Sequence, residues 1–209
     1  MFSSYKKATL AIVDTVNNLV PGRQRYLRPE TATISDALIA SLADAGRVAY
    51  ERQLLLSSVA EISVRRDERF VITGQGTDLL EIVPEDVRRT EIEAATLPGW
   101  APVHFDWHRA IYKSTDSNAV LFCQPIEVVA AANMDNVAFA QASPVAASIV
   151  GGICVVPTSS DIPDTIKLYE HHAYVIPHAG AVVRGSSPRD AVRRAEALHY
   201  LARLVLAGS

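Results

Sequence analysis

The stretch NAVLFCQP, residues 118–125, has the pattern of a strand buried inside a sheet. Apolar side chains run without a break from Ala119 to Cys123, which is typical of a strand covered on both faces. Pro125 follows two residues later, and proline is well placed in the first turn of a helix. We therefore expect a central strand over residues 118–124, whose last residues face a pocket, and then a helix that reaches about Asn133.

Helical and strand patterns alternate along the rest of the chain. Helices are expected over residues 5–20, 34–52, 107–114, 163–170 and 187–207. Strands are expected over residues 59–65, 70–73, 90–93, 153–156, 173–176 and 181–183. Residues 134–149, which are rich in Ala and Ser, show no clear period. This order predicts an α/β domain in which helices are layered on a mainly antiparallel or mixed sheet.

Length, charge and cysteine content narrow the class of protein. At 209 residues the chain fits one domain, with a core over residues 31–209 and a helical arm over residues 1–30. Its 20 basic and 23 acidic residues give a net charge of −3, which argues against nucleic acid as an obligate partner. No apolar run approaches the length of a membrane span, and residues 1–18 are followed by no signal-peptide cleavage site. With only two cysteines, Cys123 and Cys154, a reduced, cytoplasmic protein is expected.

Several short segments follow one another in an order that is known from one family. They are ISVR (62–65), FVITGQG (70–76), IVPEDV (82–87), HRAIY (108–112) and NAVL (118–121), with a closing strand and helix over residues 180–202. As an ordered set, over about residues 34–207, they resemble the class II aldolase and adducin family. The resemblance implies a three-layer α/β/α sandwich around a mainly antiparallel or mixed central sheet. It also implies a homo-oligomer, a tetramer as in the family's enzymes, with the active site near a subunit boundary.

The resemblance further implies zinc, which the family's enzymes bind with three histidines. Two of these form an H-x-H pair on the central strand, where residues two apart point to the same side and reach one ion. In this chain the pair aligns with Phe122 and Gln124, and the third ligand aligns with Ala179, one residue from His178. A phenyl ring has no ligand atom and an amide is a weak zinc ligand, so we expect no metal cofactor here.

The other functional positions implied by the resemblance also differ. The family's proton-transferring glutamate is replaced by His104. The glycine–asparagine turn that helps hold a substrate phosphate is replaced by Ala60-Glu61, and a carboxylate at Glu61 would repel a phosphate. The serine pair that precedes the glutamate is replaced by Pro102-Val103. The scaffold signals therefore persist while the site signals are absent together.

Two functions stay open on this basis. The first is a non-catalytic or re-purposed family member that acts as a binding or assembly module, as the adducin head domain resembles these enzymes without being an active aldolase. The second is a lyase of the aldolase or decarboxylase type that needs no metal, in which His104 carries the proton, Gln124 orients a carbonyl and His178 adds to a protonatable cluster. We favour the first, because Phe122 and Ala179 put apolar groups where chemistry needs donors or ligands.

Either function would suit a small polar carbonyl or sugar-like ligand. The loop Gly74-Gln75-Gly76 is a candidate for approaching such a ligand through its backbone, and Phe122 is a candidate for lining the pocket. A plain turn would explain the two glycines equally well. Isolated loop or surface histidines would likewise explain His104 and His178 without any function.

Overall fold

The computed structural model describes residues 34–56, 60–132, 139, 141–156, 164–166 and 170–208. Residues Ile34–Ser209 form one compact unit. The helix expected over residues 5–20, the arm over residues 1–30, and half of the helix expected over residues 163–170 lie outside the described residues. The division into an arm and a core over residues 31–209 therefore stays a prediction.

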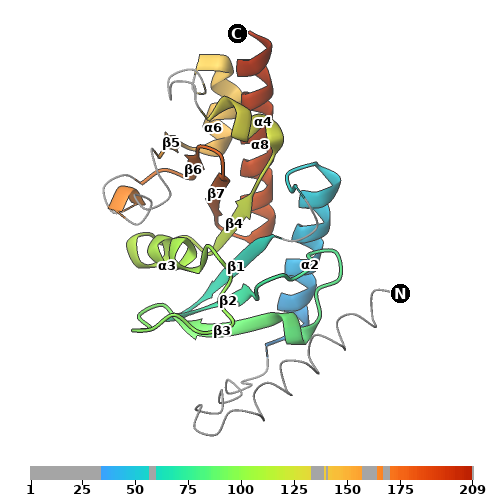
Figure 1. Cartoon of the computed structure of the whole chain (residues 1–209), viewed down its shortest axis with the longest axis vertical. Helices are drawn as coiled ribbons and strands as arrows, with labels where there is room; N and C mark the ends of the chain where they lie inside the picture. The colour runs from blue at the N-terminus through green and yellow to red at the C-terminus, as the bar shows by residue number, and fades with distance from the viewer. Residues whose placement is uncertain are drawn as a thin grey trace, which may run out of the picture. The chain divides into compact units, whose positions relative to one another are not determined.

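A seven-stranded mixed sheet forms the centre of the described part of the chain (Figure 1), in the order β3-β2-β1-β4-β7-β6-β5. The strands are β1 Glu61–Arg66, β2 Arg69–Thr73, β3 Val87–Glu91, β4 Ala119–Cys123, β5 Ile153–Val155, β6 Ala173–Ile176 and β7 Gly180–Gly185. All neighbours pair antiparallel except β5 and β6, which are parallel. The stretch NAVLFCQP supplies β4, which lies between β1 and β7 in the middle of the sheet.

Helices begin where short polar side chains and prolines predict that they should. The described helices are α2 Asp36–Glu51, the 3₁₀ turn η1 Pro84–Asp86, α3 Phe105–Ser114, α4 Ile126–Ala131, α6 Pro144–Val150 and α8 Pro188–Ala207. The side chains of Ser35 and Ser187 accept hydrogen bonds from backbone N–H groups in the first turns of α2 and α8, as N-caps do. Pro125 is the N-cap residue of α4. Ser143 caps α6 in the same way, so the Ser-Pro pair marks a helix start in a segment whose periodicity gave none.

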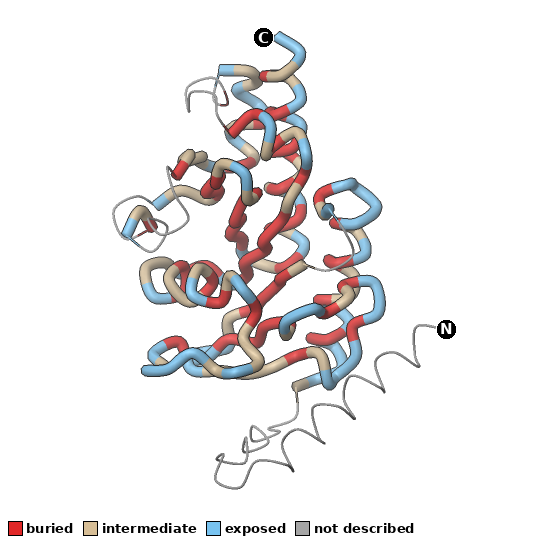
Figure 2. The backbone as a smooth tube through the Cα atoms, viewed as in Figure 1, coloured by how far each residue is buried: buried red, intermediate tan, exposed pale blue. Residues whose placement is uncertain are grey.

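Two apolar clusters cover the two faces of the sheet, which makes the domain a three-layer α/β sandwich and confirms the expected fold class. One face of β4, with Leu121 and Cys123, packs in the cluster that contains residues of α2, α4, α6 and α8. The other face, with Val120 and Phe122, packs in the cluster that contains residues of α3. Figure 2 shows the buried positions concentrated in the central strands. Cys123 therefore points away from Phe122, as the alternation of a strand predicts.

The backbone after β6 turns back to β7 very close to the end of β4. Gly180, the first residue of β7, has a φ of 133°, a value that side chains other than hydrogen rarely allow. A Cβ on Gly180 would collide with the backbone carbonyl of Cys123 and lie 2.9 Å from Cγ of Gln124. The absence of a side chain at Gly180 therefore lets the turn before β7 pack against the last residues of β4.

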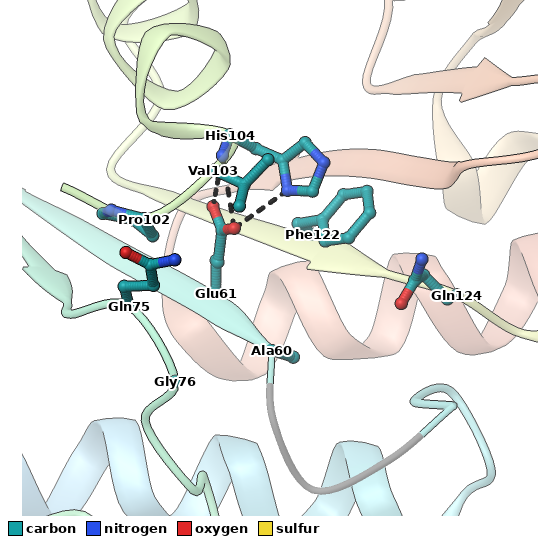
Figure 3. A pocket seen from close by; sticks show the side chains of 9 residues that line it. All are labelled: Ala60, Glu61, Gln75, Gly76, Pro102, Val103, His104, Phe122 and Gln124. Atoms are coloured by element: carbon teal, nitrogen blue, oxygen red, sulfur yellow. Dashed lines mark hydrogen bonds and ion pairs between the residues drawn. The ribbon is translucent and has the colours of Figure 1, made fainter. Parts of the chain in front are cut away.

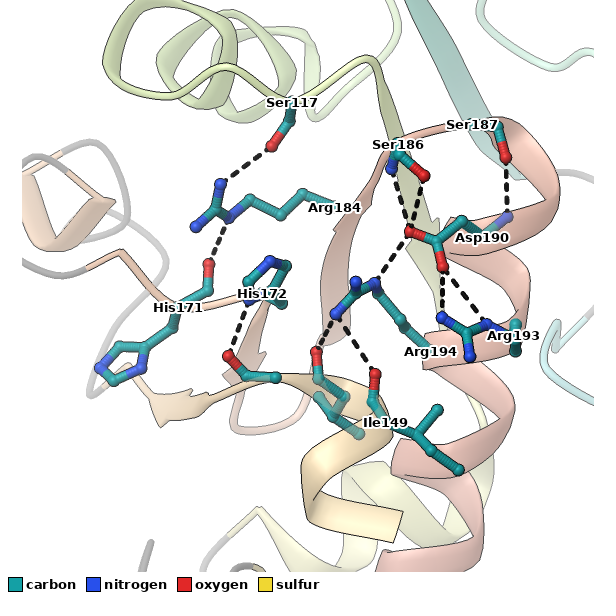
Figure 4. Close-up of polar contacts among 12 residues, drawn as sticks. Ser117, Ile149, His171, His172, Arg184, Ser186, Ser187, Asp190, Arg193 and Arg194 are labelled. Carbon is teal, nitrogen blue, oxygen red and sulfur yellow. Dashed lines mark hydrogen bonds and ion pairs between the residues drawn. The ribbon is translucent and has the colours of Figure 1, made fainter. Parts of the chain in front are cut away.

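A polar network ties α8 to the rest of the domain (Figure 4). Asp190, in the first turn of α8, accepts hydrogen bonds from the backbone N–H of Ser186, from Arg193 and from Arg194. Arg194 also donates to the carbonyl oxygen of Val150 at 2.6 Å, at the last residue of α6. Burial opposes the charge on Asp190, but these hydrogen bonds outweigh it and hold its pKa well below the ordinary value. Asp190 therefore stays ionised, binds the residue that follows β7, and is linked to α6 through Arg194.

No helix in the described ranges is long and apolar enough to cross a membrane.

We predict that Asp190→Ala lowers the free energy of unfolding at pH 7 by about 2 kcal/mol, since hydrogen bonds to a charged group are lost. Because the pKa of Asp190 is depressed in the folded state, its contribution is present above the unfolded value near 4 and is lost as the pH falls below it. Urea unfolding at pH 7 and pH 3 should show the difference between wild type and variant shrinking at low pH. The matched control is Asp44→Ala, at an exposed carboxylate paired with Arg47, which should cost less than about 1 kcal/mol. Equal effects of the two substitutions would contradict the assignment.

Candidate functional site

A pocket of about 320 Å³ opens where the start of β1 and the end of β4 meet the loop after β2 and the start of α3 (Figure 3). Its lining residues are Ala60, Glu61, Gln75, Gly76, Pro102, Val103, His104, Phe122 and Gln124. They come from segments that are far apart in the sequence and that the β1–β4 pairing brings together. In that pairing Glu61 lies directly opposite Phe122, so both side chains project from the same face of the sheet.

The carboxylate of Glu61 is the polar centre of the pocket wall. It accepts hydrogen bonds from the backbone N–H of His104 at 3.1 and 3.2 Å and contacts His104 Nδ1 at 2.9 Å. His104 is the N-cap residue of α3, and the start of a helix favours a negative charge. Glu61 is only 8% exposed, so these donors replace the water that a buried carboxylate loses.

Aromatic packing fixes the ring of His104. The ring stacks on Phe122, with centroids 3.8 Å apart and an angle of 29° between the planes, and lies 4.2 Å from the ring of Trp107. Figure 3 shows Nδ1 directed at Glu61 while the opposite edge of the imidazole points away from the carboxylate. Because an ionised carboxylate only accepts hydrogen bonds, the contact at Nδ1 requires the proton to be on that nitrogen.

A second, fully buried histidine lies behind the first. His108 Nδ1 is 2.7 Å from Ser63 Oγ, which in turn is 2.7 Å from the hydroxyl of Tyr112. Burial lowers the pKa of His108 to about 4, although the charge of Glu61 opposes the shift. Burial likewise raises the pKa of Tyr112 well above its ordinary value. Both groups are therefore neutral near pH 7.

The three positions that the resemblance assigns to metal ligands do lie together. Phe122 lies near the end of β4 and Gln124 directly follows the strand, and Gln124 Nε2 donates to the carbonyl oxygen of Ala179 at 2.8 Å. The described residues contain no group of three or more His, Cys, Asp or Glu that could hold a metal ion. A phenyl ring, an amide already bonded to the backbone and a methyl group do not form a zinc-binding donor set.

Five of the seven residues predicted from the sequence line the pocket: Gln75, Gly76, His104, Phe122 and Gln124. Two do not. His178 is exposed on the turn between β6 and β7, with a φ of 62°. Gly74 lies beside the pocket, where its N–H donates to the carbonyl oxygen of Asp86. The binding and catalytic roles of all seven stay predictions.

The residues that organise the site are not predicted from the sequence. For Glu61 the sequence predicts only repulsion of a phosphate, whereas in the structure Glu61 holds His104. A usable signal was present: Glu61 and Ser63 are two apart on one strand and so share a face, while His104, His108 and Tyr112 are four apart around one helix. The two sets of polar side chains could have been matched across the β1–α3 contact.

Comparison with known proteins agrees with this fold. A model of the family described as "Class II Aldolase and Adducin N-terminal domain" matches residues 40–206, and the chain therefore belongs to that family. A search of curated proteins finds no match. Among solved structures, L-fuculose-1-phosphate aldolase from Thermus thermophilus has a TM-score of 0.68 at 21% identity, covering 82% of this chain and 95% of its own.

Two further solved structures share the fold. YgbL from Klebsiella pneumoniae, a candidate aldolase, epimerase or decarboxylase, has a TM-score of 0.71 at 22% identity, covering 82% of this chain and 89% of its own. A sugar-phosphate aldolase from Thermotoga maritima has a TM-score of 0.64 at 18% identity, covering 80% and 94%. At these identities the likeness establishes the fold alone, and the earlier resemblance is confirmed at the level of the family.

The buried His108 generates a prediction about pH. A histidine in the unfolded chain binds a proton near pH 6.5, whereas His108 in the folded state does so only near pH 4. Between these values the unfolded state holds more protons, so stability should fall as the pH drops through this window. From pH 6.5 to 5 the loss due to His108 should be on the order of 2 kcal/mol.

His108→Gln removes this titration, so urea unfolding at pH 6.5 and pH 5 should show a smaller loss for the variant than for wild type. The two proteins share every other titratable group, so the difference between their losses is attributed to residue 108. Identical losses in the two proteins would mean that His108 does not resist protonation in the fold.

Proposed function

We propose that this chain is a re-purposed member of the class II aldolase and adducin family whose pocket binds a small polar ligand without zinc. The observation that carries the proposal is the identity of the side chains at the three ligand positions. Phe122 is occupied in stacking on His104, Gln124 in bonding to the backbone of Ala179. The three positions therefore supply no imidazole and no thiolate that could bind zinc.

The class of ligand follows from the lining and from the relatives. The pocket combines an aromatic wall, a histidine, two glutamines and a carboxylate, which suits a hydroxylated or carbonyl compound that both donates and accepts hydrogen bonds. Solved relatives carry names such as L-fuculose-1-phosphate aldolase and sugar-phosphate aldolase, which supports a small sugar-like molecule. The proposal includes a binding or assembly role of the adducin kind in a homo-oligomer, tetrameric by resemblance, and a cytoplasmic location.

Metal analysis tests this proposal directly. The protein purified without chelators and dialysed against zinc, manganese or cobalt should retain well under about 0.1 metal ion per chain, since the donor set lacks the three ligands of a zinc site. Inductively coupled plasma mass spectrometry gives the ratio. Stoichiometric metal that resists dialysis would overturn the proposal.

A second candidate function is favoured by one specific observation, the hydrogen bond between Glu61 and His104. A carboxylate that orients an imidazole is an arrangement suited to proton transfer near pH 7. In this alternative the chain is a metal-independent lyase of the aldolase or decarboxylase type. His104 moves the proton, and Gln124, whose amide has a second N–H beyond the one given to Ala179, orients the substrate carbonyl.

Substitution of the two candidate histidines separates this alternative from a binding role. If a screen of small hydroxy-carbonyl compounds finds a turnover, His104→Ala should lower kcat/KM by about 100-fold or more, the usual effect of losing a general acid or base. The matched control is His178→Ala, on the exposed turn and absent from the described lining of the pocket, which should change kcat/KM by less than about threefold. A larger loss would instead support the place of His178 in the protonatable cluster. Activity that survives His104→Ala unchanged would remove His104 from the mechanism.

A further inference from the structure

Among the described residues that line the pocket, Glu61 is the only acidic or basic one besides His104. From this geometry we propose that Glu61 is a positioning and selectivity residue: it holds His104 with Nε2 as a hydrogen-bond acceptor, and it makes the pocket prefer an uncharged hydroxylated ligand over a phosphorylated one. The inference rests on the proposed function of the pocket as a ligand site. It adds the charge class of the ligand and the atom that contacts it.

The described hydrogen-bond donors to Glu61 belong to His104, and none is a lysine or an arginine. Both carboxylate oxygens face the backbone N–H of His104 at the start of α3, and Oε1 also contacts Nδ1 of the same residue. Within the described part of the chain, none of the salt bridges of Glu61 involves a lysine or an arginine; its partners are His104 and His108. The negative charge is therefore stabilised in place by hydrogen bonds without an arginine or lysine to neutralise it.

Nε2 of His108 is completely buried and has no hydrogen-bond partner among the described residues. It lies 3.7 Å from Glu61 Oε2. If Tyr112 donates to Ser63 and Ser63 donates to His108 Nδ1, the single proton of the neutral ring must be on Nε2, facing the carboxylate. The opposite direction would aim a lone pair of Nε2 at a carboxylate oxygen, which is repulsive. The favoured arrangement adds a third N–H directed at Glu61.

The contact with Glu61 fixes the tautomer of His104. Its Nδ1 is committed to the carboxylate, and the nitrogen opposite a committed one takes the remaining role. Nε2 then has a free lone pair and accepts a hydrogen bond. The ring of His104 stacks on Phe122 and lies against the tilted ring of Trp107, and this packing opposes a turn of the imidazole that would exchange its two nitrogens. A ligand hydroxyl is the natural donor to Nε2, because a fully ionised phosphate offers only acceptors.

Electrostatic repulsion from Glu61 disfavours a phosphate in this pocket. A phosphate bound in this pocket would sit beside a carboxylate of the same sign and would find no lysine or arginine among the described lining residues. At separations of about 5–6 Å and a dielectric constant near 20, the repulsion is ample for a tenfold discrimination. The same position that the family resemblance assigns to phosphate binding is therefore converted into one that excludes it.

The tautomer of His104 is the first test. In ¹⁵N-labelled protein at pH 8, long-range ¹H–¹⁵N correlation spectra should show His104 as the Nδ1–H form in wild type and in Glu61→Gln, whose carbonyl can still accept. Glu61→Ala should shift His104 towards the Nε2–H form that free histidine favours. An Nε2–H form in the wild-type protein overturns the inference by itself, whether or not the alanine variant folds.

Ligand charge is the second test, with glycerol and glycerol 1-phosphate as a matched pair of probes. Chemical-shift titrations of wild type should give a dissociation constant at least about tenfold lower for glycerol, and Glu61→Gln should reduce this ratio to about threefold or less. Tighter binding of glycerol 1-phosphate to wild type would overturn the selectivity. If neither probe shifts the resonances of the pocket, the selectivity claim fails while the tautomer test still decides the positioning role. Stoichiometric metal in the purified protein would contradict the proposed function, whereas the tautomer of His104 in wild type tests the positioning role of Glu61 independently.

Discussion

The antiparallel register between β1 and β4 is the constraint on which the whole site depends. It sets Glu61 opposite Phe122, and β7 on the other side of β4 sets Val182 opposite the same phenylalanine. A slip of one residue would turn Glu61 to the face covered by α8 and leave a carboxylate in the larger apolar cluster. The next pair along the two strands, Ile62 and Leu121, holds this register, because both side chains are fully buried on that other face.

The burial of Glu61 becomes acceptable only through the start of α3. The carboxylate and the backbone N–H of His104 at the helix start are each poorly satisfied alone, and each supplies what the other lacks. His104 takes part twice, with its backbone and with its ring. The contact therefore links the helix on one face of the sheet to the strand that carries the site, so stability and site geometry depend on the same atoms.

Much of the fold was predictable from local signals, and the site was predictable only in part. The unbroken apolar run of β4 gave a central strand with Cys123 and Phe122 on opposite faces, and serine caps gave the starts of α2 and α8. The role of Glu61 was not predicted, because periodicity tells which face a side chain takes but not what the facing element presents to it. His178 was placed near the site by counting along the chain, but the turn before β7 directs it to solvent.

The backbone crowding at Gly180 has a consequence for how such chains are recognised. By the resemblance, a glycine follows the family's third ligand histidine, yet here that glycine, Gly180, follows Ala179 in a chain without that histidine. What demands it is the carbonyl of Cys123, which would occupy the space of any side chain. This glycine thus marks the close packing of β7 against the end of β4. A sequence pattern built around it will identify chains that share the fold, whether or not they share the metal-dependent activity.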